Sequence, residues 1–181
     1  MKTLIAATAL ALLITGCASG VSRQPTKTDQ LTATTAQPAK VSKTNPLTSV
    51  TATLSKEAAD KQADNLKFNK EMLLDNVKRA LEANQFLLAD YKKPNLSLEI
   101  LVKDMRVRSN FSAIMFGFMA GNDSITGDII IRDAKGLEID RFEVSASYAL
   151  GGIAGGVDDA RMSWLYENFA LETVNEIKAG K

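Results

Sequence analysis

Few residues of this chain could do chemistry through a thiol or an imidazole. Among its 181 residues, Cys17 is the single cysteine and histidine is absent. This composition excludes a zinc site of the His/Cys type, a Ser-His-Asp or Cys-His nucleophile and an internal disulfide. We therefore expect a protein that is not an enzyme and that holds no cofactor and no metal.

Carboxylates are the remaining candidates for catalysis or metal binding. Asp158 and Asp159 are adjacent at the expected start of a helix, where carboxylates commonly cap the helix and interact with its dipole. Asp104, Arg106 and Arg108 alternate along a predicted strand, which favours a solvated row of charges. A hydrolase that uses these three aspartates is the least favoured interpretation.

The amino terminus has the layout of a secretory signal. A short basic segment, Met1-Lys2-Thr3, precedes the apolar run Leu4 to Ile14, and the small residues Thr15 and Gly16 then precede Cys17. A membrane-spanning anchor is an alternative, but the run is far shorter than the roughly 20 apolar residues that a spanning helix needs. An ordinary secretory signal followed by a chance cysteine is the other alternative.

Ile14-Thr15-Gly16-Cys17 resembles a lipobox, the processing site of bacterial lipoproteins. The resemblance implies that residues 1–16 are removed and that Cys17 becomes a lipidated first residue that carries two or three acyl chains, such as palmitate. Two or more chains anchor a protein lastingly. Ala18 and Ser19, rather than an aspartate, follow the cysteine, which implies an outer-membrane lipoprotein that faces the periplasm, with surface display as an alternative.

The next stretch, up to about Pro46, is rich in Thr, Ser, Ala, Gln and Lys and has few large apolar residues. Such a segment buries too little surface to offset its chain entropy, so residues 17–46 are expected to form a disordered linker. A flexible coil of this length would span roughly 30 Å on average. Residues 47–181 are expected to form one domain, whose slightly acidic charge does not favour binding to nucleic acid.

The periodicity of this domain predicts an α+β fold with the order β-α-β-β-β-α. About four strands would form a small, mainly antiparallel sheet with two helices packed on one face. The predicted strands are Leu47 to Leu54, Leu96 to Arg108, Ser124 to Asp133 and Leu137 to Tyr148, with a bulge near Lys103-Asp104 and another in the last strand. The predicted helices run from Ser55 or Asp64 to Asn84, with Met72 on the apolar stripe, and from Asp158 or Asp159 to Lys178.

Two segments could carry function. The stretch Phe111 to Gly121 has no charge and is interpreted as a loop that contacts a membrane or partner. The alternative is a segment that extends the preceding strand or is buried under the second helix. Its candidate contact residues are Phe111, Ile114, Met115, Phe116, Phe118 and Met119. The second segment contains Gly151, Gly152, Gly155 and Gly156 and favours a flexible loop, because it lacks the Gly-Lys-Ser/Thr ending of a phosphate-binding loop.

The run from Leu98 to Ile177 resembles a family of bacterial lipoproteins catalogued as domain of unknown function 4410. The resemblance rests on a strand, a loop ending in a Gly-Phe-Gly-Ala-Gly type sequence, a strand hairpin, a glycine-rich loop and a closing helix. The corresponding segments are Gly117 to Gly121, Ile125 to Ile131, Ala134-Lys135-Gly136, Gly151 to Gly156 and Asp159 to Ile177. The sequence departs from the family at Met119, where glycine is common. The family implies no assigned chemistry.

These observations lead to two principal functional expectations. The first is a membrane-anchored scaffold or protein-binding module of the cell envelope, with an envelope protein as its partner. The second is an auxiliary component of an envelope transport system that binds a lipid or small ligand, with Phe111 to Gly121 as a lid over an apolar pocket.

Overall fold

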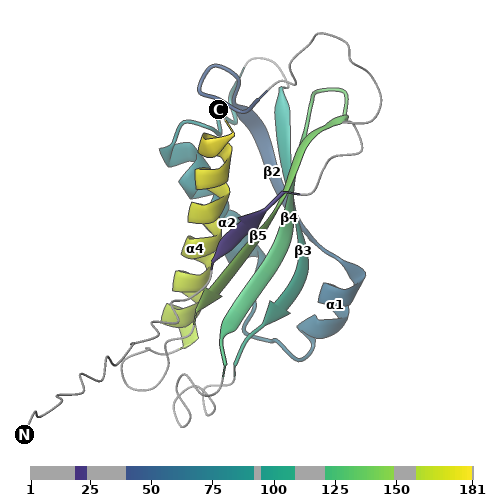
Figure 1. The fold of residues 1–181 in the computed structure, drawn as a ribbon, viewed down its shortest axis with the longest axis vertical. Coiled ribbons are helices and arrows are strands. Elements are labelled where there is room, and N and C mark those ends of the chain that lie inside the picture. Colours follow the sequence, from purple (N-terminus) through teal and green to yellow (C-terminus); the bar gives the residue numbers. More distant parts are fainter. Residues whose placement is uncertain (1–18, 24–39, 92–94, 109–120, 149–157, 181) are drawn as a thin grey trace, which may run out of the picture.

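The computed structural model describes residues 19–23, 40–91, 95–108, 121–148 and 158–180. The fold is α+β, as the sequence predicts. A five-stranded sheet has the order β1-β5-β4-β3-β2, and all neighbours are antiparallel except β2 and β3, which are parallel (Figure 1). The strands are β1 (Gly20–Ser22), β2 (Leu47–Leu54), β3 (Leu96–Arg106), β4 (Asp123–Arg132) and β5 (Glu138–Tyr148).

The fifth strand corrects the prediction of about four strands. Gly20–Ser22 pairs with β5 at the edge of the sheet, inside the segment that was expected to be a disordered linker. Val41 is also buried, and Ser42 and Asn45 form a bridge before β2. The expectation of disorder is therefore wrong for these two stretches, because Val21 and Val41 supply apolar contacts that composition averaged over the whole segment conceals.

Both predicted bulges are present. The register of β3 against β4 shifts between Val102 and Asp104, where the apolar residues change sides. The register of β4 against β5 shifts between Ile131 and Arg132, which leaves Ile139 as the extra residue of β5. The β4–β5 hairpin turns at Gly136, whose φ of 81° is a conformation that glycine adopts without steric cost.

The first predicted helix is two helices, α1 (Lys56–Gln62) and α2 (Lys70–Ala83). The break occurs because asparagine side chains hydrogen bond to the backbone at each helix end. Asn65 donates to the carbonyl of Lys61, and Asn69 accepts from the N–H of Met72 at the start of α2. Met72 itself is 46% exposed, so its predicted place in the apolar stripe is wrong.

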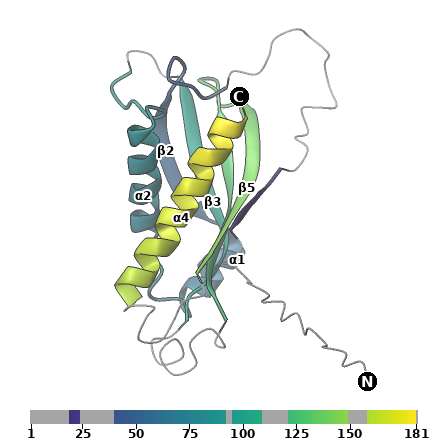
Figure 2. The ribbon, with the colours of Figure 1, turned by 60° about the vertical axis from the view of Figure 1, so that its left-hand side comes forward.

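Helices α2 and α4 (Asp158–Ala179) cover the same face of the sheet, as predicted, while α1 lies at one end of the sheet (Figures 1 and 2). The predicted buried stripe of α4 is confirmed, because Met162, Leu165, Phe169, Val174 and Ile177 are all buried. They pack against sheet residues such as Ile100, Ile129 and Phe142. Burial of a large apolar side chain contributes about 1.5–3 kcal/mol, so this layer supplies much of the stability.

Candidate functional site

Most of the residues that the sequence singles out lie outside the described part of the chain. These are Cys17, the candidate loop residues Phe111, Ile114, Met115, Phe116, Phe118 and Met119, and the glycines Gly151, Gly152, Gly155 and Gly156. Helix α4 begins at Asp158, but the side chains of Asp158 and Asp159 also lie outside the description. Asp104 is described, and it forms a solvent-exposed ion pair of 2.6 Å with Lys61.

Arg108 corrects the prediction of a solvated row of charges. Its side chain is only 2% exposed, and its Nη2 lies 3.0 Å from the carboxylate of Asp123, which is fully buried. The same carboxylate lies 3.3 Å from Nη1 of Arg161, a buried residue of α4. A buried charge is costly unless it is paired, which explains why these side chains occur together.

This buried cluster of Arg108, Asp123 and Arg161 joins four elements. Arg108 also donates to the carbonyl of Tyr148 at the end of β5, and Arg161 donates to the carbonyl of Arg108. Arg161 was not predicted from the sequence, although it precedes Leu165 and Phe169 by four and eight residues and so shares their buried side of α4. The cluster connects the strand ends near Arg108, Asp123 and Tyr148 to the first turns of α4.

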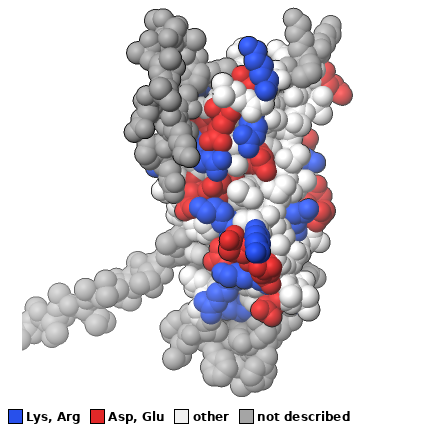
Figure 3. All heavy atoms as spheres, turned by 90° about the vertical axis from the view of Figure 1, so that its right-hand side faces the viewer, with Lys and Arg blue, Asp and Glu red and all other residues white. Residues whose placement is uncertain are grey.

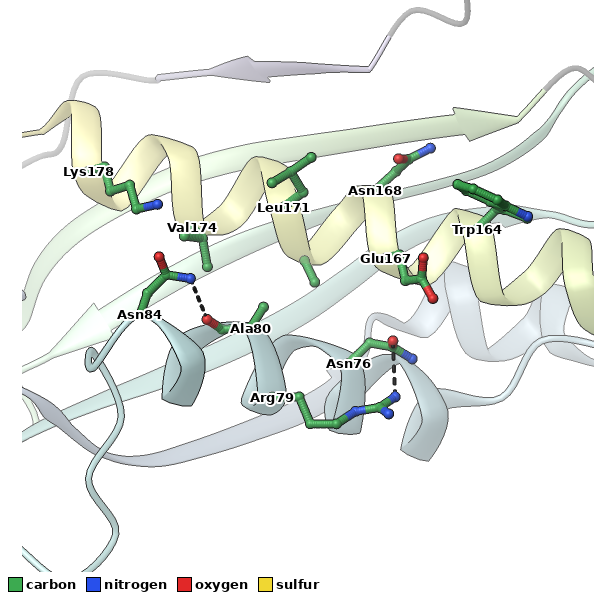
Figure 4. Close-up of a pocket in the computed structure, with 11 residues that line it drawn as sticks. Asn76, Arg79, Ala80, Asn84, Trp164, Glu167, Asn168, Leu171, Val174 and Lys178 are labelled. Atoms are coloured by element: carbon green, nitrogen blue, oxygen red, sulfur yellow. Dashed lines mark hydrogen bonds between the residues drawn. The ribbon is translucent and has the colours of Figure 1, made fainter.

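A groove between α2 and α4 is a candidate binding site on the outer side of the helical layer. Its volume is about 550 Å³. Figure 4 shows that Asn76, Arg79 and Ala80 come from α2, that Asn84 caps the end of α2, and that the remaining labelled residues come from α4. The lining residues of α4 are Trp164, Glu167, Asn168, Ala170, Leu171, Val174 and Lys178.

Two large apolar side chains of this groove are exposed. Trp164 is 55% exposed and Leu171 is 54% exposed, and the spacing of seven residues places both on one side of α4. The polar wall of α2 is held by local hydrogen bonds. Arg79 donates to Asn76 at 3.1 Å, and Asn84 donates to the carbonyl of Ala80 at 2.7 Å. Two exposed apolar side chains beside fixed amide groups suit a partner with both apolar and hydrogen-bonding groups.

The other face of the sheet carries alternating charges in Figure 3, without a large patch of one sign. Lys103 donates to Glu143, and this hydrogen bond raises the pKa of Lys103. Arg141 donates to Glu138 and also binds Asp128. The hydrogen bond from Arg141 lowers the pKa of Glu138 and outweighs burial, which acts in the opposite direction.

Between the sheet and the helices, the described side chains are closely packed. Tyr166, Phe169 and Phe142 are each at most 1% exposed there. Burial raises the pKa of Tyr166, and its hydroxyl oxygen accepts a hydrogen bond of 2.7 Å from the N–H of Asn69. The side chain thereby ties α4 to the start of α2. Within the described ranges, no three potential metal ligands among His, Cys, Asp and Glu are grouped together.

None of the helices in the described part of the chain has the length and apolar character needed to cross a membrane.

A comparison with sequence families identifies the family of this chain. The sequence model described as "Domain of unknown function (DUF4410)" matches residues 30–152, which is more than half of the chain. The chain belongs to this family. The match begins well before the expected Leu98 and ends before α4. A search of curated proteins finds no match.

Several solved structures are similar to this chain at low sequence identity. The PelC dodecamer from Paraburkholderia phytofirmans has 8% identity and a TM-score of 0.44, over 83% of this chain and 97% of that chain. A variant of the PelC dodecamer from the same organism has 8% identity and a TM-score of 0.40, over 84% and 98%. A structure described only as an uncharacterized protein has 14% identity and a TM-score of 0.41, over 81% and 97%.

Proposed function

We propose that this protein is a lipid-anchored lipoprotein of the outer membrane, facing the periplasm, and that it acts as a non-enzymatic module that binds an envelope protein. The lipobox-like sequence ending at Cys17 supports the anchor. Asp104 offers little support for catalysis, because an exposed ion pair with Lys61 leaves its carboxylate solvated. The proposed partner site is the groove between α2 and α4.

The observation that carries this proposal is the exposure of Trp164 and Leu171 on a helix whose other face is fully packed. Exposed large apolar side chains can mark interaction sites, and tryptophan is enriched among the residues that dominate binding energy. Trp164 and Leu171 lie two turns apart on α4, with Asn168 between them (Figure 4). Amides and charges of both signs surround the pair, from Asn76 to Lys178. We propose that the partner contributes an amphipathic segment whose apolar side chains contact Trp164 and Leu171.

Photo-crosslinking in intact cells tests this site. A photoreactive amino acid replaces Leu171, and the matched control carries it at Leu137, which is 61% exposed on the β4–β5 hairpin. We expect a discrete crosslinked partner from position 171 alone, and a several-fold weaker crosslink when Trp164→Ala is added. Equal crosslinking at both positions, or a crosslink that Trp164→Ala leaves unchanged, would contradict the proposed site.

A second candidate function is binding of a lipid or small ligand within an envelope transport system. The volume of the groove, about 550 Å³, supports it because small-ligand sites typically occupy about 300–1,000 Å³. Native mass spectrometry of protein purified from its membrane tests this alternative. A bound small molecule that Trp164→Ala removes would favour the ligand, whereas a protein mass without any adduct would favour the protein partner.

A further inference from the structure

We propose that the end of the sheet formed by the end of β5, the start of β4 and the end of β3 rests on the lipid bilayer, so that the domain is held at the membrane in one orientation. This inference rests on the proposed lipidation of Cys17. It replaces the expectation that a disordered linker over residues 17–46 separates the lipid from the domain. The partner of this surface is therefore the lipid surface itself.

The path of the chain around β1 is the first observation. Gly20 lies opposite Ser145 and Ser22 lies opposite Glu143, with β1 antiparallel to β5. The chain that precedes Gly20 therefore leads toward Tyr148, where β5 ends. Only three residue steps separate Cys17 from Gly20, which corresponds to a reach of about 10 Å. The lipid on Cys17 must therefore lie close to this end of the sheet.

Arg23 holds β1 in this position. Its Nη1 lies 2.8 Å from Asp140 on β5, and its Nε lies 2.5 Å from Glu176 on α4. Its guanidinium carbon also lies 5.4 Å from the centre of the Phe142 ring. These contacts reach two different elements, so they fix the strand in direction as well as in place. Residues 24–39 make up most of the segment that was expected to be a disordered linker, and they follow β1 in the chain. They therefore do not lie between the lipid on Cys17 and the strand β1.

The same end of the sheet carries a prominent exposed apolar side chain. Leu66 is 84% exposed. Its neighbour Asn65 accepts a hydrogen bond of 2.7 Å from the N–H of Val107, just beyond the end of β3. Strands β1, β5, β4 and β3 are adjacent, so Leu66 lies on the order of 15 Å across the sheet from the exit of the lipid.

The charges around Leu66 fit a bilayer surface without requiring an acidic one. Lys67 follows Leu66 and Asp64 precedes it, and the nearby Lys61 is paired with Asp104. We therefore expect the lipid chains and apolar contact, rather than attraction to anionic headgroups, to determine the orientation.

Fluorescence quenching on the full, lipidated protein in vesicles of phosphatidylethanolamine and phosphatidylglycerol tests the orientation. Leu66→Cys provides one labelling site for a small fluorophore, and Leu137→Cys, on the hairpin at the opposite end of the sheet, provides the matched control. Lipid acylation of Cys17 leaves each introduced thiol as the single site. With nitroxide-labelled lipids in the bilayer, we expect quenching at position 66 to be several-fold stronger than at position 137.

Equal quenching at positions 66 and 137, in protein that remains bound to the vesicles and carries lipid on Cys17, would overturn the orientation and leave the proposed function intact. Protein without lipid on Cys17 that does not bind the vesicles would overturn the proposed function as well. Arg23→Ala should reduce the difference between the two positions while membrane binding persists. Lys40→Ala, which removes a charge from the same part of the chain without touching these contacts, should preserve the difference.

Discussion

The carboxylate of Asp123 lies 3.0 Å from the guanidinium of Arg108, and both side chains are almost wholly excluded from water. The pair joins the end of β3 to the start of β4, and the same carboxylate faces Arg161 of α4. Sheet and helix thus share one buried negative charge. Its removal should therefore loosen three elements together.

Asp123→Asn should lower the free energy of unfolding by about 3–5 kcal/mol, because it removes a buried carboxylate that pairs with the buried guanidinium groups of Arg108 and Arg161. Asp104→Asn is the matched control, since Asp104 pairs with Lys61 in a solvent-exposed position, and it should cost less than about 1 kcal/mol. Urea unfolding followed by circular dichroism measures both. Similar losses in the two variants would mean that the buried cluster contributes no more than a surface ion pair.

Two neighbouring apolar residues of α4 should differ sharply in their effect on stability. Phe169→Ala empties a fully buried position and should cost about 3–5 kcal/mol. Leu171→Ala changes a residue that is 54% exposed and should stay within about 0.5 kcal/mol. Thermal unfolding of the two variants compares them directly, and a large loss for Leu171→Ala would show that this side chain belongs to the core rather than to a free binding surface.

The β4–β5 hairpin needs a glycine at position 136. Gly136→Ala should cost about 1 kcal/mol, because the φ of 81° is unfavourable for a residue with a Cβ even though nothing crowds the site. Gly20→Ala provides a control at a glycine that is equally uncrowded and has no positive φ. Chemical denaturation should show that Gly136→Ala is less stable than Gly20→Ala. Equal stabilities of the two variants would contradict the role assigned to Gly136 in the turn.

Glu138 should contribute to acid sensitivity. The hydrogen bond from Arg141 lowers the pKa of this carboxyl below its ordinary value of 4.5 in the folded protein. The folded state therefore binds the proton less readily than the unfolded chain, so the stabilisation is present above about pH 4.5 and is lost as the pH falls through the folded pKa.

Unfolding free energies measured between about pH 6 and pH 3 test this sign. Glu138→Gln should be less stable than the parent at the higher pH, and the difference should shrink toward acid. Glu71→Gln, at an exposed carboxyl that lies 3.4 Å from the ammonium group of Lys70, is the matched control and should change the stability little. A gap for Glu138→Gln that widens toward acid would contradict the assigned shift.

The sequence was sufficient to predict the elements with strong hydrophobic periodicity. The buried stripe of α4, the β4–β5 hairpin and the change of parity near Lys103 are all found as predicted. Pattern alone could not place β1, because three residues become a strand only through pairing with β5 and through the contacts of Arg23 with Asp140 and Glu176.

The candidate sites were harder to predict because they depend on partners distant in sequence. Arg108 alternates with Asp104 like a surface residue, and only the approach of Asp123 and Arg161 makes its burial possible. The groove also requires α2 and α4 to lie side by side. A local sequence pattern does not indicate this packing, because the two helices are far apart in the sequence. The candidate contact residues between Phe111 and Met119 and the lipidation site at Cys17 lie outside the described residues, so their roles remain predictions.

The central claim is that Cys17 carries the lipid that anchors the domain. Mass spectrometry of the mature protein extracted from cell membranes tests it most directly. We predict an amino-terminal peptide that begins at Cys17 and carries a diacylglycerol on the thiol, with or without a third acyl chain on the amine. A mature chain that begins elsewhere, or one with an unmodified Cys17, would contradict the account.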